Sequence, residues 1–435
     1  MAEFQQILVK FTPDVQVPYQ DGIEAQLRDI VGPVWDTIVA QAPFEISFLR
    51  LYDNDDVFGL VEAARQAVGD QAPDLLRWFR VPFPEGADAE GVAALLRGLP
   101  GVEHAFVETH AVLAMATSTE PHRATQTWQD AAPTGIGVDA ARDQPGGMGA
   151  GVNYVDVEYG WRLDHEDLVD IGLTVESGPN NAVLQFSTGP LDVRLHGTPV
   201  LAITAATETG VGGVGIAPQV NVHLVSAFDS AVGGFNHHPA ITTAIGRAGS
   251  GGILLIELQD PTFGPIEMNP AHQAELFTAT SLGVTVIEPA GNGTVDLNAF
   301  QDFFGRHVLD RSSADFFESG AVMVGSATSA TPRSRLASSS FGSRIDCYAW
   351  GQDIHAASGA GTNTYDAFSG TSGASAIIAG VAASIQGMAL AKRGQFLTPA
   401  EVRQLLLIGS DVDDGAAPPT VIGTMPDLAQ IATLI

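Results

Sequence analysis

The first part of the chain alternates short apolar runs with stretches in which apolar residues recur at helical spacing. Alternating or continuous apolar runs predict strands, and apolar residues three and four positions apart predict helices. On these rules strands are expected at residues 4–11, 45–52, 75–82 and 102–108. Helices are expected at residues 22–41, with an interruption near Pro33, at 57–68 and at 86–99.

When the helix at 57–68 is set aside, the predicted elements follow in the order βαββαβ, which is the ferredoxin-like pattern. We therefore expect a small α+β domain over residues 1–112. The next segment, 113–134, is small, polar and rich in threonine, and it contains Pro121 and Pro133. Such a composition is typical of a linker, so a processing site is expected here if the chain is cleaved.

Beyond the linker, apolar strands alternate with helical stretches, as a parallel sheet flanked by helices requires. The expected strands lie at residues 151–156, 220–226, 252–258, 283–288 and 321–326. The expected helices lie at residues 197–207, 237–249, 270–282, 373–391 and 399–408. Residues 135–435 are therefore predicted to form one large α/β domain.

Charge narrows the set of partners. The sequence has 50 aspartates and glutamates against 20 lysines and arginines, a formal net charge of −30. Nucleic acids and anionic membranes bind basic patches, so neither is expected as a partner. An acidic protein instead attracts cationic substrates.

Targeting signals and cysteines say little about where the protein acts. We recognise neither a signal peptide nor a transmembrane span, so synthesis in the cytoplasm is expected, and later export by a non-Sec route stays open. Cys347 is the only cysteine, which excludes an intrachain disulfide. Its setting resembles a strand interior and predicts a buried, unreactive thiol.

The stretch FSGTSGASAIIAG, residues 368–380, carries the first sign of chemistry. Ser372 stands where an apolar helical run begins. The positive end of the helix dipole and the unpaired backbone N–H groups at such a start favour a serine nucleophile. An N-cap serine on a core helix has the same pattern, so the interpretation depends on partners elsewhere in the chain.

Three upstream segments supply those partners. Asp156 ends the apolar run GVNYVD, His196 opens the run LHGTPVLAITAA, and Asn292 lies in EPAGNG. Together with the stretch at Ser372, and in the order Asp, His, Ser, these segments resemble the subtilisin-like serine peptidases, or subtilases. The resemblance covers roughly residues 125–435. The four segments together are highly specific, although each alone is weak.

The resemblance implies a doubly wound, mostly parallel sheet and a serine endopeptidase that acts through an acyl-enzyme. Ser372 would be the nucleophile, His196 the general base and then acid, and Asp156 the carboxylate that orients the imidazole. Asn292 would hold the oxyanion together with the backbone N–H of Ser372. No cofactor is required. Structural calcium is common in the family, but we recognise no loop in which to place it and no metal-ligating motif.

Two other functions share part of this pattern. A catalytically silent pseudoprotease would bind peptides in the same cleft, but the intact set of four positions favours an enzyme. An esterase of another fold would carry Gly-x-Ser-x-Gly at its nucleophile, which the residues around Ser372 do not supply.

The substrate cleft departs from the family's pattern. The usual Ser-Leu-Gly of the substrate-binding strand is Glu257-Leu258-Gln259 here, and Glu288 ends the strand that leads to Gly291. We expect Glu257, Glu288 and Gly291 to contact a protein or peptide substrate. If both carboxylates face the cleft, lysine or arginine is the preferred P1 residue.

Residues 1–112 resemble subtilase propeptides, with LPGVEHAFVE matching their last helix and strand. The resemblance implies a zymogen in which this domain assists folding or inhibits the catalytic domain. Its last residues, with Val112, Leu113 and Met115, would lie in the cleft as a substrate-like strand. Cleavage between residues 111 and 127 would then release activity.

Overall fold

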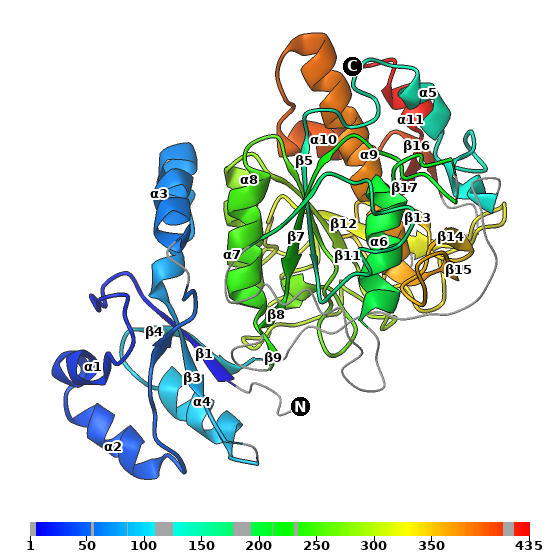
Figure 1. The fold of residues 1–435 in the computed structure, drawn as a ribbon. Coiled ribbons are helices and arrows are strands. Elements are labelled where there is room, and N and C mark those ends of the chain that lie inside the picture. Colours follow the sequence, from blue (N-terminus) through cyan, green and yellow to red (C-terminus); the bar gives the residue numbers. More distant parts are fainter. Residues whose placement is uncertain are drawn as a thin grey trace.

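The computed structural model describes residues 6–53, 56–84, 86–108, 125–176, 193–210, 212–229, 234–411 and 422–435. Figure 1 shows a small domain, drawn in blue, beside a larger α/β domain that runs from green to red. Most of the predicted linker, up to residue 124, lies outside the described residues.

The small domain is built on an antiparallel four-stranded sheet in the order β2-β3-β1-β4. This order is the one that the βαββαβ pattern predicts. The strands are β1 (Gln6–Phe11), β2 (Leu49–Arg50), β3 (Trp78–Pro82) and β4 (Val102–Val107). The helices are α1 (Glu24–Val31), α2 (Pro33–Gln41), α3 (Asp56–Val68) and α4 (Ala89–Arg97). The interruption predicted near Pro33 is confirmed, because Gly32, at φ 64°, ends α1 and Pro33 begins α2.

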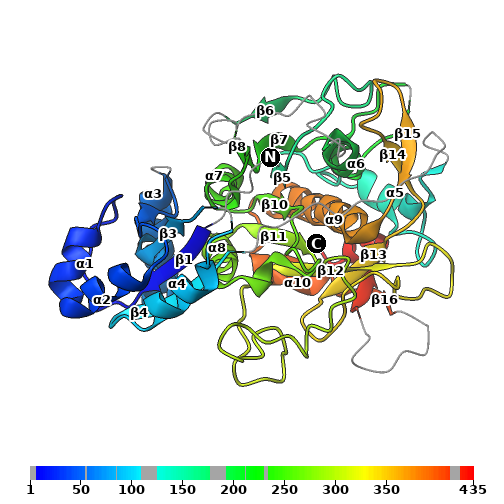
Figure 2. The ribbon, with the colours of Figure 1, turned by 90° about the horizontal axis from the view of Figure 1, so that it is seen from below.

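Side chains alternate between the two faces of a strand, and in this small sheet both faces carry apolar side chains. In β1, Ile7 and Val9 pack in the domain's own core, whereas Leu8 faces the opposite side. That second face packs with α3 and with Ala271 and Ala274 of the large domain. The small domain is therefore docked through an apolar surface. Figure 2 shows from below how it lies beside α7 (His237–Ala248) and α8 (Pro270–Ser281).

The large domain is organised around a nine-stranded sheet in the order β16-β17-β13-β12-β11-β10-β5-β7-β6. Every neighbouring pair is parallel except β16 and β17 at one edge. The strands are β5 (Asn153–Glu158), β6 (Leu173–Val175), β7 (Asn221–Ser226), β10 (Ile253–Ile256), β11 (Thr285–Pro289), β12 (Val322–Ala327), β13 (Cys347–Trp350), β16 (Gly409–Asp411) and β17 (Thr424–Pro426). All five predicted strands are confirmed, and Cys347 is buried in β13 as expected.

Helices cover both faces of this sheet. Helices α6 (Arg194–Ala205) and α9 (Gly370–Arg393) contribute to one core, and α7 (His237–Ala248) and α8 (Pro270–Ser281) to the other. Along β5, Tyr154 faces the first core, whereas Val155 and Val157 face the second. Since side chains alternate, Asp156 and Glu158 lie on the same side of the sheet as α6 and α9.

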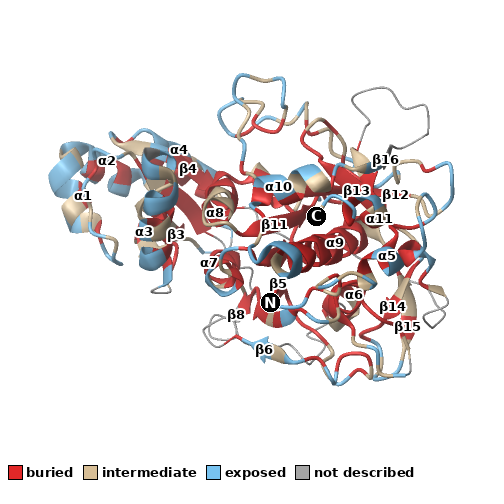
Figure 3. Cartoon of the chain, turned by 90° about the horizontal axis from the view of Figure 1, so that it is seen from above, coloured by how far each residue is buried: buried red, intermediate tan, exposed pale blue. Residues whose placement is uncertain are grey.

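Helix α9 is the central element of the large domain, as the burial colours of Figure 3 show. It is long and apolar enough to cross a membrane, but 89% of its most hydrophobic window is buried among the surrounding elements. A buried core helix of this kind passes the same length and composition test as a membrane span. Immediately before it lies the hairpin of β14 (Ile354–Ala357) and β15 (Tyr365–Phe368), which the sequence did not predict.

Candidate active site

Ser372 is the third residue of α9, and only 1% of its surface is exposed. The helix begins at Gly370, whose φ of 88° strongly favours glycine. A side chain at that position would also meet Asn292 Oδ1 at 3.1 Å. The glycine before Ser372 therefore lets the start of α9 approach Asn292 closely.

Asn292 is held against the start of the same helix. The backbone N–H of Thr371 donates to Asn292 Oδ1 over 3.0 Å. The backbone N–H of Asn292 in turn donates to Gln259 Oε1 over 3.2 Å. Because Oδ1 accepts from the helix, Nδ2 of Asn292 is the side-chain atom that remains to donate to a ligand beside Ser372.

His196 is the third residue of α6, and 1% of its surface is exposed. Its ring lies edge-on to Phe368, with ring centroids 5.3 Å apart. Helix α6 is fastened to α9 by the Thr204 hydroxyl, which donates to the carbonyl of Ala376 over 3.0 Å. The structure thus places His196 and Ser372 near the N-termini of two helices that pack on the same face of the sheet.

The predicted partnership of His196 with Asp156 is wrong. His196 Nδ1 makes a short, buried contact with Glu158 Oε1. Asp156 instead accepts a 2.8 Å hydrogen bond from Trp161 Nε1 through Oδ2, and its Oδ1 has no hydrogen-bond partner among the described residues. Glu158 therefore occupies the position that the sequence analysis gave to Asp156.

The physical reason is the length of β5. The prediction ended this strand at Asp156, but the ladder with β7 continues to Glu158. Functional groups of parallel sheets gather just outside the carboxyl ends of the strands, so the last acidic residue reaches the site and the earlier one stays inside. The sequence held a signal for this longer strand. Apolar and acidic residues alternate without a break through Val155, Asp156, Val157 and Glu158, and Gly160 follows soon after.

Glu257 lies directly after β10 and enters the same site, fully buried. The Ser375 hydroxyl makes a short contact with Glu257 Oε1 and also lies 2.9 Å from the carbonyls of Thr371 and Ser372. The polar atoms of Glu158, His196 and Glu257 all lie within 4.8 Å of one another. That spacing would also suit a cation, but the direct contact of Nδ1 with Glu158 fits a proton-sharing pair.

Two carboxyl groups, those of Glu158 and Glu257, lie beside the imidazole of His196, and the carboxyl group of Asp156 interacts with both of them. Burial, followed by the charge of Glu158, raises the pKa of Asp156 well above its usual range, although Trp161 opposes the shift. Burial likewise raises the pKa of Glu158 and of Glu257. Neighbouring buried carboxyls cannot all be ionised, because like charges at short range repel in a medium of low dielectric constant. These shifts favour the protonated form of at least one of the three carboxyl groups.

Glu288 does not face the cleft, so the expectation of an S1 pocket lined by two glutamates is wrong. Its carboxylate is fully buried and lies 3.5 Å from Arg344, in a cluster with Glu267 and Asp346. Glu257 is turned toward Ser375 instead of a substrate side chain. Gly291, at φ 87°, is packed against the backbone of Phe263 and Gly264.

Residues 185–417 match the model of the subtilase family, a stretch that includes His196, Asn292 and Ser372 but begins after Glu158. Subtilisin DY of Bacillus licheniformis is 28% identical over 241 residues, which cover 55% of this chain and 78% of that protein. Subtilisin E of Bacillus subtilis is 27% identical over 55% of this chain and 56% of that protein.

Solved structures show the same fold. Fervidolysin from Fervidobacterium pennivorans, described as a keratinolytic enzyme related to subtilisin, aligns with 100% of this chain and 62% of its own, at 16% identity and a TM-score of 0.59. A protease of Pseudoalteromonas arctica aligns with 74% of this chain and 100% of its own, at 22% identity and a TM-score of 0.53. The first likeness extends over the small N-terminal domain as well as the large one.

Proposed function

The chain belongs to the subtilase family and is a serine-type endopeptidase, and from that premise we propose a mechanism with Glu158 in the triad. Ser372 attacks the substrate carbonyl, His196 accepts and returns the proton, and Glu158 orients the imidazole. The observation that carries the proposal is the buried contact between His196 Nδ1 and Glu158. A serine-directed phosphonofluoridate tests the nucleophile of this mechanism, because the reagent labels an activated serine hydroxyl.

Each step of the proposed mechanism is assigned to one of the residues described above. Ser372 Oγ bonds to the carbonyl carbon while its proton passes to His196 Nε2, and the same proton then goes to the leaving amine nitrogen. Water repeats the sequence to release the acyl group. Glu158 can only accept a hydrogen bond when ionised, so it keeps the proton on Nδ1 and leaves the Nε2 lone pair for serine.

We assign Glu257 the role of a neutral acid. When protonated it donates to Ser375 Oγ, and Ser375 then donates to the carbonyls of Thr371 or Ser372. This arrangement removes one negative charge from the surroundings of Glu158 and holds the first turn of α9. The raised pKa of Glu257, caused by burial and opposed by His196, agrees with the neutral form.

The oxyanion is expected to bind between Asn292 Nδ2 and the backbone N–H of Ser372. Replacing Asn292 by alanine removes one preorganised donor, so we expect kcat to fall by about 10²–10³-fold with little change in KM. Steady-state kinetics on a peptide substrate measure the split. A loss confined to KM would instead assign Asn292 to ground-state binding.

We also propose that the N-terminal domain inhibits the catalytic domain within the uncleaved chain. The aromatic ring of Phe106 in the small domain stacks on Phe303 of the large domain, with ring centroids 4.8 Å apart. The ring centroids of His104 and Phe304 lie 5.0 Å apart across the same boundary. Together with the apolar surface on α8, these contacts support stable docking. The segment that would enter the cleft, with Val112, Leu113 and Met115, lies outside the described residues.

Ala274 on α8 tests the inhibitory role because it is 7% exposed and packs against the small domain. An arginine there places a charge in an apolar interface, which is costly, so Ala274→Arg should undock the domain. We expect the uncleaved variant to hydrolyse peptides at least about tenfold faster than the uncleaved wild type. Once the apolar contact is lost, the tether still gives the small domain an effective concentration of only about the millimolar range, which does not keep the weakened domain bound.

The matched control is Gly246→Arg, which adds the same side chain at an exposed position of α7 with open space around it. It should leave the rate unchanged. Equal rates for Ala274→Arg and wild type, with undocking shown by increased protease sensitivity of the small domain, would make that domain an accessory module.

A further inference from the structure

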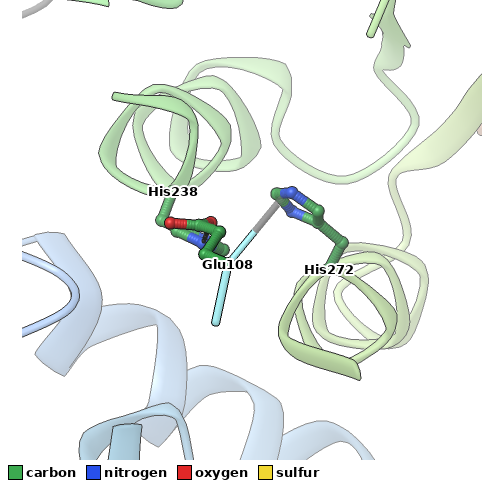
Figure 4. A group of neighbouring side chains, drawn as sticks. All are labelled: Glu108, His238 and His272. Atoms are coloured by element: carbon green, nitrogen blue, oxygen red, sulfur yellow. Dashed lines mark hydrogen bonds and ion pairs between the residues drawn. The ribbon is translucent and has the colours of Figure 1, made fainter. Parts of the chain in front are cut away.

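Three buried side chains meet where the two domains touch. Glu108 directly follows β4 of the small domain, His238 lies in the first turn of α7 and His272 in the first turn of α8. At most 6% of each residue is exposed. Figure 4 shows the three side chains turned toward one another, and their potential ligand atoms all lie within 4.8 Å of each other.

A fourth residue, Glu275, fixes the orientation of both imidazoles. Its Oε1 accepts from His238 Nδ1 over 2.7 Å, and its Oε2 accepts from His272 Nδ1 over 2.8 Å. A carboxylate only accepts, so each Nδ1 carries a proton and each neutral ring has its lone pair on Nε2. The two rings stack with centroids 4.6 Å apart and an angle of 25° between their planes.

This arrangement matches the way proteins prepare histidines for a metal. Metal-ligating histidines donate their second N–H to a carboxylate, which fixes the tautomer and makes the ligand more basic. Glu275 does this for two histidines at once. Glu108 supplies an oxygen 2.5 Å from His238 Nε2, and the side-chain amide of Gln6 contacts its other oxygen.

The charge of the pocket also favours a divalent ion. The ring of His238 lies between two carboxyl groups, with Nδ1 2.7 Å from Glu275 Oε1 and Nε2 2.5 Å from Glu108 Oε1, so without a metal a proton lies between Nε2 and Glu108. That proton balances one of the two negative charges, whereas a divalent ion balances both.

We propose that Glu108, His238 and His272 bind a divalent transition-metal ion, zinc by preference, that joins the N-terminal domain to the catalytic domain. Two imidazole nitrogens and a carboxylate oxygen are a zinc donor set, with metal–ligand distances of about 2.0–2.2 Å. Two ligands of a tetrahedral ion lie about 3.4 Å apart at those distances, so Glu108 and His238 separate by about 1 Å when the ion replaces the proton.

The site was missed by the sequence analysis because its ligands lie far apart in the chain and form no motif. Since one ligand comes from the small domain and two from the large one, metal binding and docking stabilise each other. That a bound ion would also strengthen inhibition rests on the proposed function. The metal site itself does not depend on the proposed function.

The test uses the full chain carrying Ser372→Ala, so that self-cleavage does not alter the sample. After removal of metals with a chelator, the protein is titrated with Zn²⁺ against a chromophoric competitor, and with Co²⁺ by visible absorption. We expect one equivalent of tightly bound ion, an absorption typical of four-coordinate cobalt, and a rise in melting temperature with Zn²⁺. Calcium, which prefers oxygen ligands, should not compete.

His272→Ala removes one ligand and keeps the contact between His238 and Glu108, so we expect affinity for Zn²⁺ to fall about 100-fold or more. His272→Gln serves if the alanine variant fails to fold. The matched control is His223→Ala, which removes a histidine from another pair with a glutamate, 2.6 Å from Glu176. Absence of saturable binding to the parent chain, or equal affinity in the His272 variant, overturns the proposal. Peptidase activity, measured separately on the chain with Ser372, distinguishes this failure from failure of the proposed function.

Discussion

Replacing Ser372 by alanine is expected to lower kcat for peptide hydrolysis by about 10⁶-fold, the magnitude known for removal of the serine of subtilisin. The loss is large because nucleophile, base and orienting carboxylate act as one unit. In the proposed mechanism the hydroxyl of Ser372 is the group that forms the acyl-enzyme. Burst kinetics measure the loss of acyl-enzyme formation in the variant. Mass spectrometry measures the phosphonylation of Ser372 in the wild type and its loss in the variant.

Ser384→Ala is the matched control, because Ser384 is a buried serine in the same helix and its hydroxyl has no hydrogen-bond partner among the described residues. It should retain both activity and labelling. The measurements need the catalytic domain freed from the small domain by cleavage between residues 111 and 127. If that protein resists the reagent although it is folded, the assignment of Ser372 is refuted.

Glu158→Gln is expected to lower kcat by about 10⁴-fold while KM changes little. The glutamine amide presents an N–H₂ group as well as a carbonyl, so it no longer enforces the tautomer with its proton on Nδ1 and no longer stabilises the imidazolium. Steady-state kinetics and a pH–rate profile of the variant measure the effect. Glu158→Asp, shorter by one methylene, should recover part of the loss.

Asp156→Asn is the comparison that decides which carboxyl belongs to the triad. Asparagine still accepts from Trp161 Nε1, so kcat should stay within about tenfold of wild type. The opposite ranking, with a large loss for Asp156→Asn and a small one for Glu158→Gln, would restore the original assignment.

The same variant reports on stability. Because the pKa of Asp156 in the folded chain is raised above its ordinary 3.8, the folded state keeps a proton that the unfolded chain releases. The free energy of unfolding therefore falls as pH rises from about 4 toward the raised pKa, by roughly 1 kcal/mol per pH unit for this group. Urea unfolding should show Asp156→Asn gaining stability over wild type across that range.

The sequence by itself determined the elements and most of the chemistry. Apolar periodicity is a local property, so it located the four strands of the small sheet, five strands of the large one and the core helix α9. Ser372, His196 and Asn292 were predicted as site residues because the short segments that hold them, together with the one at Asp156, resemble the subtilases. At Gly370 the left-handed backbone and the closeness of Asn292 leave no room for a side chain.

Only the tertiary structure decided which carboxyl groups meet which partners. Asp156 and Glu158 share one face of β5, and the length of the ladder with β7 determined that Glu158 reaches His196. The Glu288 side chain lies in the core, where it is 3.5 Å from the guanidinium group of Arg344, a residue distant in sequence. The cluster of Glu108, His238 and His272 depends on the docking of two domains. Such pairings are set by long-range packing, and among them only the position of Glu158 had a local signal, the alternation of apolar and acidic residues along β5.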